Sequence, residues 1–173
     1  MNGRNGEEVG DSWRPPDHGM LKINCNVRVD KRRRRIGFGI IVRDDEGRVL
    51  RCWAQGYEVN YDMNCAKAMA VYKGLLVGRE MGLVNYVLET DLENVIKQIM
   101  NGGNSDANHG GILDSIQILV SDVRNVGFQF VPTKANRVAL TLVNEALSIK
   151  DMTVWKEDVP MCIKAPVEGE RRS

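Results

Sequence analysis

The 173-residue chain has few of the residues that build metal or disulfide centres. Its four cysteines lie far apart without a Cys-x-x-Cys pair, and only two histidines could supplement them. We therefore expect no zinc site, and we expect reduced thiols in a nuclear or cytoplasmic protein. No apolar run approaches the ~20 residues that span a bilayer, and the first 19 residues lack the apolar core of a secretory signal.

The chain also lacks a bias in charge. It has 24 Lys and Arg residues against 23 Asp and Glu residues, which gives a formal net charge of +1. A global attraction to nucleic acid is therefore not expected, and such binding would have to come from a local patch. Hydrophobic residues make up 43% of the chain, which is enough to build the core of one domain.

Both ends of the chain are polar. Residues 1–12 are rich in glycine and charge, and residues 165–173 are similar. Such segments bury too little apolar surface to offset the entropy of ordering, so we expect disorder in both. These boundaries leave residues 13–164 as one folded domain.

Between these ends, hydrophobic periodicity predicts nine elements in the order β-β-β-α-β-α-α-β-α. Gly47 suits a tight turn between the second and third strands. Asn64 could cap the first helix, and Thr90 with Glu93 fits a capping box. The predicted strands are 20–29, 36–43, 49–59, 86–89 and 128–131, and the predicted helices are 64–81, one ending at 100, 112–123 and 139–146.

Four motifs point to one family. They lie in the segments Trp13–Asn24, Gly37–Asp44, Leu88–Asp91 and Val131–Ala139. In this order they resemble the plant ribonuclease H-like domain of non-LTR retroelement reverse transcriptases and their domesticated relatives. The resemblance runs over residues 13–163. It implies an α/β fold of the ribonuclease H type, with a five-stranded mixed sheet and helices on both faces.

The resemblance also implies four catalytic carboxylates that hold two Mg²⁺ ions. Those positions fall on Asn26, Lys67, Asp91 and Leu140, so a single acid remains. Four carboxylates carry a charge of −4, whereas Asp91 and Lys67 together sum to zero. Because Mg²⁺ requires hard, anionic oxygen ligands, we expect metal binding and RNA–DNA hybrid cleavage to be lost. No other cofactor is expected.

Each of these positions also has a plainer interpretation. Asp91 could simply stabilise the start of a helix, where the macrodipole favours an anion. Lys67 could pair with Asp91 in solvent, or its ammonium could occupy a former metal position and hold a phosphate. Leu140 could be an exposed leucine, or it could cover the former cleft with apolar surface.

A run of five cations marks the turn between the first two predicted strands: Lys31, Arg32, Arg33, Arg34 and Arg35. Such a run contributes nothing to folding, so it is either a solvated hairpin tip or a patch for nuclear localisation or nucleic-acid binding. Together with Lys67, these five are the candidate nucleic-acid contacts. No aromatic residue is interleaved, so base stacking is not indicated.

Three functions follow from these observations. The first is a catalytically degenerate ribonuclease H-like module that binds an RNA–DNA hybrid or a duplex. The second is a protein-interaction scaffold that uses the former cleft, where Leu140 and Phe130 are apolar. The third is a weakly active Mg²⁺-dependent ribonuclease, if Asp30, Asp44 or Glu89 rebuild the site. We expect a monomer with no membrane contact.

Overall fold

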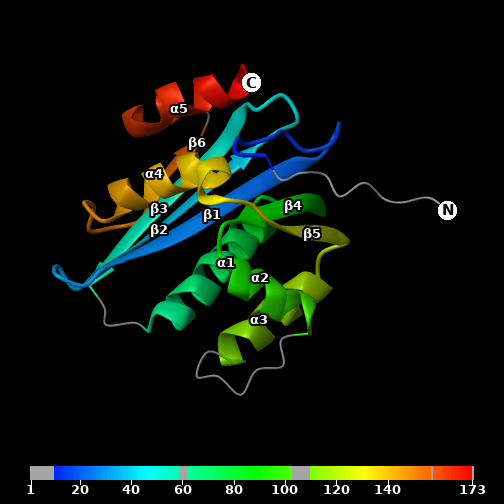
Figure 1. Cartoon of the computed structure of the whole chain (residues 1–173). Coiled ribbons are helices and arrows are strands. Elements are labelled where there is room, and N and C mark those ends of the chain that lie inside the picture. Colours follow the sequence, from blue (N-terminus) through cyan, green and yellow to red (C-terminus); the bar gives the residue numbers. More distant parts are fainter. Residues whose placement is uncertain (1–9, 59–61, 103–109, 157, 173) are drawn as a thin grey trace.

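The computed structural model describes residues 10–58, 62–102, 110–156 and 158–172. A six-stranded sheet in the order β5-β4-β1-β2-β3-β6 forms the centre of the molecule (Figure 1). β1, β2, β3 and β6 are antiparallel neighbours, whereas β4 lies parallel to both β1 and β5. The strands are β1 (Leu21–Asp30), β2 (Arg35–Arg43), β3 (Val49–Glu58), β4 (Asn85–Thr90), β5 (Asn125–Phe130) and β6 (Thr153–Lys156).

Helices cover both faces of this sheet (Figure 1). α1 (Met63–Glu80), α2 (Glu93–Met100) and α3 (Gly110–Ser121) share one core with the apolar side of β1. α4 (Arg137–Ala146) and α5 (Met161–Arg171) share a second core with β2 and β3. None of the helices in the described part of the chain is long and apolar enough to cross a membrane.

Glycines in β2 and β3 let α4 lie directly on the sheet. A Cβ atom at Gly39 would approach the Ala139 carbonyl oxygen to 2.7 Å, and one at Gly56 would approach the Ala146 oxygen to 2.2 Å. Both distances are shorter than two non-bonded heavy atoms can approach. The glycines therefore set the depth at which α4 packs, and with it the position of Leu140.

The nine predicted elements are present, in the predicted order, and the mixed sheet with helices on both faces is confirmed. The prediction of five strands is wrong, because β6 adds a sixth strand at the β3 edge. β6 has only four residues and alternates between half-buried and exposed, so its sequence signal is weak. Its stability comes from pairing with β3.

The C-terminal segment is also ordered where disorder was expected. α5 continues through residue 171, with Ile163 and Val167 buried one turn apart. Pro166 inside the helix and the polar residues around it hid this pattern. At the other end, residues 1–9 of the predicted disordered segment lie outside the described residues.

Two predicted helix caps differ from the structure. Asp62, not Asn64, caps α1 by accepting hydrogen bonds from the amides of residues 64 and 65. The Thr90 hydroxyl donates to the Cys25 carbonyl instead of capping α2, whose N-cap is Leu92. The predicted turn at Gly47 is confirmed, because this residue has a φ of 74°.

Candidate functional site

The positions that the family resemblance assigns to metal ligands begin on the neighbouring strands β1 and β4. Asn26 lies on β1, and Asp91 directly follows β4, which runs parallel to β1. Asn136 joins the two strands, because its amide nitrogen lies 3.0 Å from both the Cys25 carbonyl oxygen and Asp91 Oδ1. Asn26 is 4% exposed, and its Oδ1 accepts from the backbone amide of Val27 at 2.8 Å. The single remaining carboxylate is thus held by an amide.

We expect Lys67 to pair with Asp91, but the described residues show no such pair. Lys67 is half-buried on α1, and among the residues that the structure describes no hydrogen bond or ion pair links it to Asp91. The observed partner of Asp91 is Asn136, which is neutral. The hypothesis that the Lys67 ammonium mimics a metal beside Asp91 therefore has no geometric support.

The fourth position that the resemblance assigns to a metal ligand is apolar. Leu140 is half-buried on α4, and Phe130, at the end of β5, is 37% exposed. Across the described ranges, no group of three His, Cys, Asp or Glu side chains is placed to hold a metal ion.

The three acids that could have rebuilt the site have other partners. Glu89 is 2% exposed and accepts from Lys22 Nζ at 2.8 Å and from Asn24 Nδ2 at 2.9 Å. Asp30 accepts from the amides of residues 32 and 33 in the β1–β2 turn. Asp44 closes the β2–β3 turn.

The pKa of Asp44 reflects its role in that turn. Partial burial opposes ionisation, but hydrogen bonds from the Arg48 side chain and from two backbone amides lower the pKa of Asp44 below its ordinary value. Asp44 therefore remains an anion that holds the turn, and it is not poised for proton transfer.

A comparison with known protein families gives a direct match. The family described as reverse transcriptase-like matches residues 24–146, which span β1 to the end of α4. The chain belongs to this family. The comparison with curated proteins found no match.

Solved structures show the same ribonuclease H-like fold. The N-terminal RNase H domain of a Mycobacterium tuberculosis protein, solved as a fusion with maltose-binding protein, is 21% identical with a TM-score of 0.67, and the match covers 75% of this chain and 94% of that one. RNase H1 from Halobacterium salinarum is 18% identical with a TM-score of 0.68, covering 75% and 98%. LC11-RNase H1, in complex with an RNA/DNA hybrid, is 19% identical with a TM-score of 0.66, covering 74% and 96%.

In this reverse transcriptase-like domain, the basic β1–β2 turn projects from the end of the hairpin. Residues 31–34 are exposed, and Arg34 has a φ of 51°. Arg33 lies 3.7 Å from Asp30, which it partly neutralises. No ion pair within the described ranges involves the side chains of Lys31, Arg32 or Arg34. The charges of these three side chains are therefore exposed to solvent.

Arg35 belongs to the fold and not to this patch. Its side chain is 13% exposed and lies 3.5 Å from Glu58. Its guanidinium donates to the Leu147 oxygen at 2.9 Å and to the Ile149 oxygen. These bonds tie the chain after α4 to β2. Sequence reasoning grouped Arg35 with its neighbours because a run of cations does not reveal which of them turn inward.

A buried polar network that sequence reasoning missed lies on the same face as α5. Arg43 is 1% exposed, donates to Asn24 Oδ1 at 3.0 Å and stacks 3.7 Å from the Trp13 ring. Trp13 Nε1 also donates to Asn24 Oδ1 at 3.0 Å. Burial lowers the pKa of Arg43, and Glu170 of α5 opposes that effect by pairing with it. The only sequence signal was an arginine among apolar residues of β2.

Proposed function

We propose that this domain binds double-stranded nucleic acid, either an RNA–DNA hybrid or a duplex, and does not cut it. The observation that supports binding is the exposed β1–β2 turn, where Lys31, Arg32 and Arg34 have no ion-pair partner among the described residues. The relative LC11-RNase H1 was solved with an RNA/DNA hybrid on the same fold. Duplex phosphates attract such cations irrespective of base sequence.

The same proposal includes the loss of catalysis. Two-metal hydrolysis requires anionic oxygens around both ions. Here the donors at the family positions are one carboxylate held by Asn136 and one amide oxygen bound to Val27. Lys67 and Leu140 supply no oxygen at all. Each missing charge pair at about 4 Å is worth on the order of 4 kcal/mol near a protein surface, so this set does not fit Mg²⁺.

Binding can be tested by fluorescence anisotropy with a labelled hybrid over a range of salt concentrations. The variant Arg32→Gln/Arg34→Gln should weaken binding to any sequence and lower the salt slope by about 0.9 for each phosphate that the turn no longer neutralises. The matched control is Arg79→Gln/Arg124→Gln, which removes two exposed cations near the opposite end of β1. Equal effects of the two variants would contradict a site at the turn.

Cleavage can be tested on the same hybrid with Mg²⁺ or Mn²⁺. We expect no product. Metal-dependent cutting that disappears in Asp91→Asn would overturn the proposal and favour the weakly active ribonuclease instead.

A protein scaffold is the second candidate, because Phe130 is 37% exposed and Leu140 is half-buried near the former metal positions. If the domain shows no salt-dependent binding to hybrid, duplex or single strand, this second function takes precedence. A partner that binds the turn variant normally but not Leu140→Asp would place the interface at the former metal positions. The turn would then serve at most as a localisation signal.

A further inference from the structure

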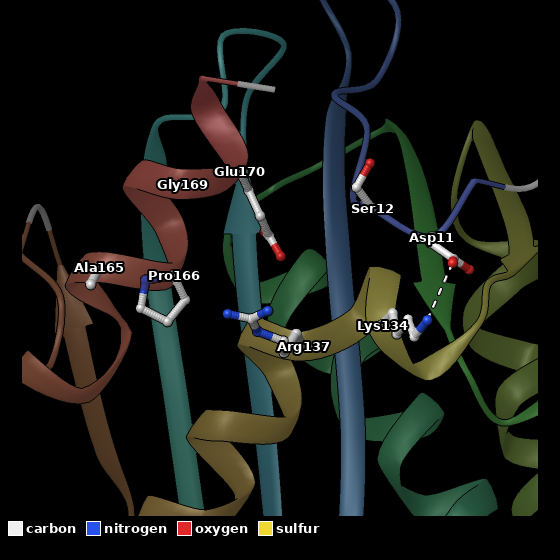
Figure 2. Close-up of a pocket in the computed structure, with 8 residues that line it drawn as sticks. All are labelled: Asp11, Ser12, Lys134, Arg137, Ala165, Pro166, Gly169 and Glu170. Carbon is white, nitrogen blue, oxygen red and sulfur yellow. Dashed lines mark hydrogen bonds and ion pairs between the residues drawn. The ribbon is translucent and has the colours of Figure 1, made fainter.

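A cavity of about 380 Å³ opens between the start of α4, one side of α5 and the chain before β1. Figure 2 shows the Arg137 side chain reaching from α4 towards α5, with its guanidinium pointing away from Lys134. Ala165 and Pro166 of α5 form the apolar wall, and polar side chains from all three segments form the rest. The lining includes Asp11, Ser12, Lys134, Arg137, Pro166 and Glu170.

One positive charge in this cavity has no counter-charge. Lys134 Nζ lies 3.3 Å from Asp11 Oδ2, so these two charges cancel. Glu170 pairs with the buried Arg43. Among the described residues, the side chain of Arg137 forms no hydrogen bond or ion pair. The charged side chains that line the cavity, together with the buried Arg43, therefore have a net charge of +1. The unpaired charge is that of the Arg137 guanidinium, which faces the open space.

We infer that this cavity, the Arg137 pocket, binds a phosphate group carried by a nucleotide or by a strand of nucleic acid. A planar guanidinium binds two phosphate oxygens at once. Ser12 can add a neutral hydroxyl donor. Ala165 and Pro166 offer an apolar wall for the sugar or base, and the volume lies within the range of small-molecule sites.

The pocket lies only partly within the matched family segment, which contains Lys134 and Arg137. Residues 11–12 and 165–170 lie outside residues 24–146, to which the family match is confined. The pocket adjoins the former metal positions, because Asn136, which holds Asp91, directly precedes Arg137. With a strand as the ligand, the inference rests on the proposed function and deepens it. With a free nucleotide, it is independent of that function.

Isothermal titration calorimetry with inorganic phosphate, dAMP and deoxyadenosine tests the inference. We expect dAMP to bind and deoxyadenosine not to bind. Arg137→Gln should weaken dAMP binding about tenfold or more, the loss typical of a charge-assisted hydrogen bond. Arg124→Gln, an exposed control in the loop before β5, should change nothing. Asp11→Asn removes an anion from the wall and should tighten binding about twofold to fivefold.

Two oligonucleotides, one with a 5′ phosphate and one with a 5′ hydroxyl, separate the two sources of phosphate. Tighter binding of the phosphorylated strand that disappears in Arg137→Gln identifies a strand end as the ligand. Binding of dAMP alone identifies a nucleotide. Both measurements can be repeated with the Arg32→Gln/Arg34→Gln variant. Failure of hybrid binding at the turn can therefore be distinguished from failure of phosphate binding in the Arg137 pocket. No binding of phosphate or dAMP, or equal losses in Arg137→Gln and Arg124→Gln, would overturn the inference.

Discussion

The buried pair of Lys22 and Glu89 gives a direct test of how the sheet is held together. Their side chains are 5% and 2% exposed, and Lys22 Nζ lies 2.8 Å from Glu89 Oε2. Lys22 also donates to the Arg14 oxygen at 2.7 Å, and Asn24 donates to the other Glu89 oxygen. Replacing Glu89 with Gln keeps the shape but leaves the Lys22 ammonium without a buried counter-charge.

The expected cost follows from the burial. Breaking a buried ion pair by removing one partner destabilises a protein by about 3 to 5 kcal/mol. For a chain of this size, that loss lowers the melting temperature by roughly 6 to 20 °C. The control is Glu93→Gln, which breaks the pair of Glu93 and Lys97. Those side chains are 48% and 64% exposed, so the cost should stay below about 1 kcal/mol.

Urea denaturation followed by circular dichroism measures both variants. The double variant Lys22→Met/Glu89→Gln should recover part of the loss, because it removes both buried charges. If Glu89→Gln costs no more than Glu93→Gln, the pair is not buried as described. The single variant Lys22→Met completes the cycle. If the double variant loses more stability than Lys22→Met and Glu89→Gln lose in total, the two charges do not stabilise each other as described.

Three further predictions concern the thiols, the turn and the former metal positions. Burial raises the pKa of the Cys25 and Cys52 thiols from 9.0 to about 12. Their contribution to stability is therefore complete below pH 9 and is lost as the pH rises towards 12. By pH 10 each thiol should lower the unfolding free energy by about 1.4 kcal/mol, and Cys52→Ala should show about half of the total drop in urea titrations. Arg35→Gln should lower the melting temperature and Arg32→Gln should not, because only Arg35 donates to the chain after α4; equal thermal shifts would refute this assignment. Asn26→Asp/Lys67→Glu/Leu140→Asp should gain Mg²⁺ affinity by calorimetry, and a folded triple variant without that gain would show that the geometry of the centre has also changed.

The sequence predicts most of the sheet because its signals are local. Leu21, Ile23, Cys25, Val27 and Val29 alternate along β1, and each of them packs in or against one core. Gly82 ends α1 with a φ of 68°, as its position after the predicted helix indicates. Such features depend on neighbours in sequence, and they lead to the observed element order.

The missed features depend on partners that are distant in sequence. β6 is stabilised by β3, and α5 by the core around Ile41 and Cys52. Arg35 and Arg43 look like surface arginines in the sequence, yet each has a partner more than 100 residues away. Hydrophobic periodicity reflects neighbouring residues and does not indicate partners that are distant in sequence. For the same reason the sequence predicts Thr90 as a helix cap, whereas its hydroxyl donates across the sheet to the Cys25 carbonyl.

The pairing of Arg43 with Glu170 has a consequence for synthesis of the chain. The two residues are 127 positions apart in the sequence. At ~5–20 residues per second, roughly 6 to 25 s separate the translation of the two. During that interval β1 and β2 can pair, but Arg43 does not yet have Glu170 as its ion-pair partner. The second face of the sheet therefore closes only after α5 has been translated, so a nascent chain stalled before α5 should remain sensitive to protease on that face.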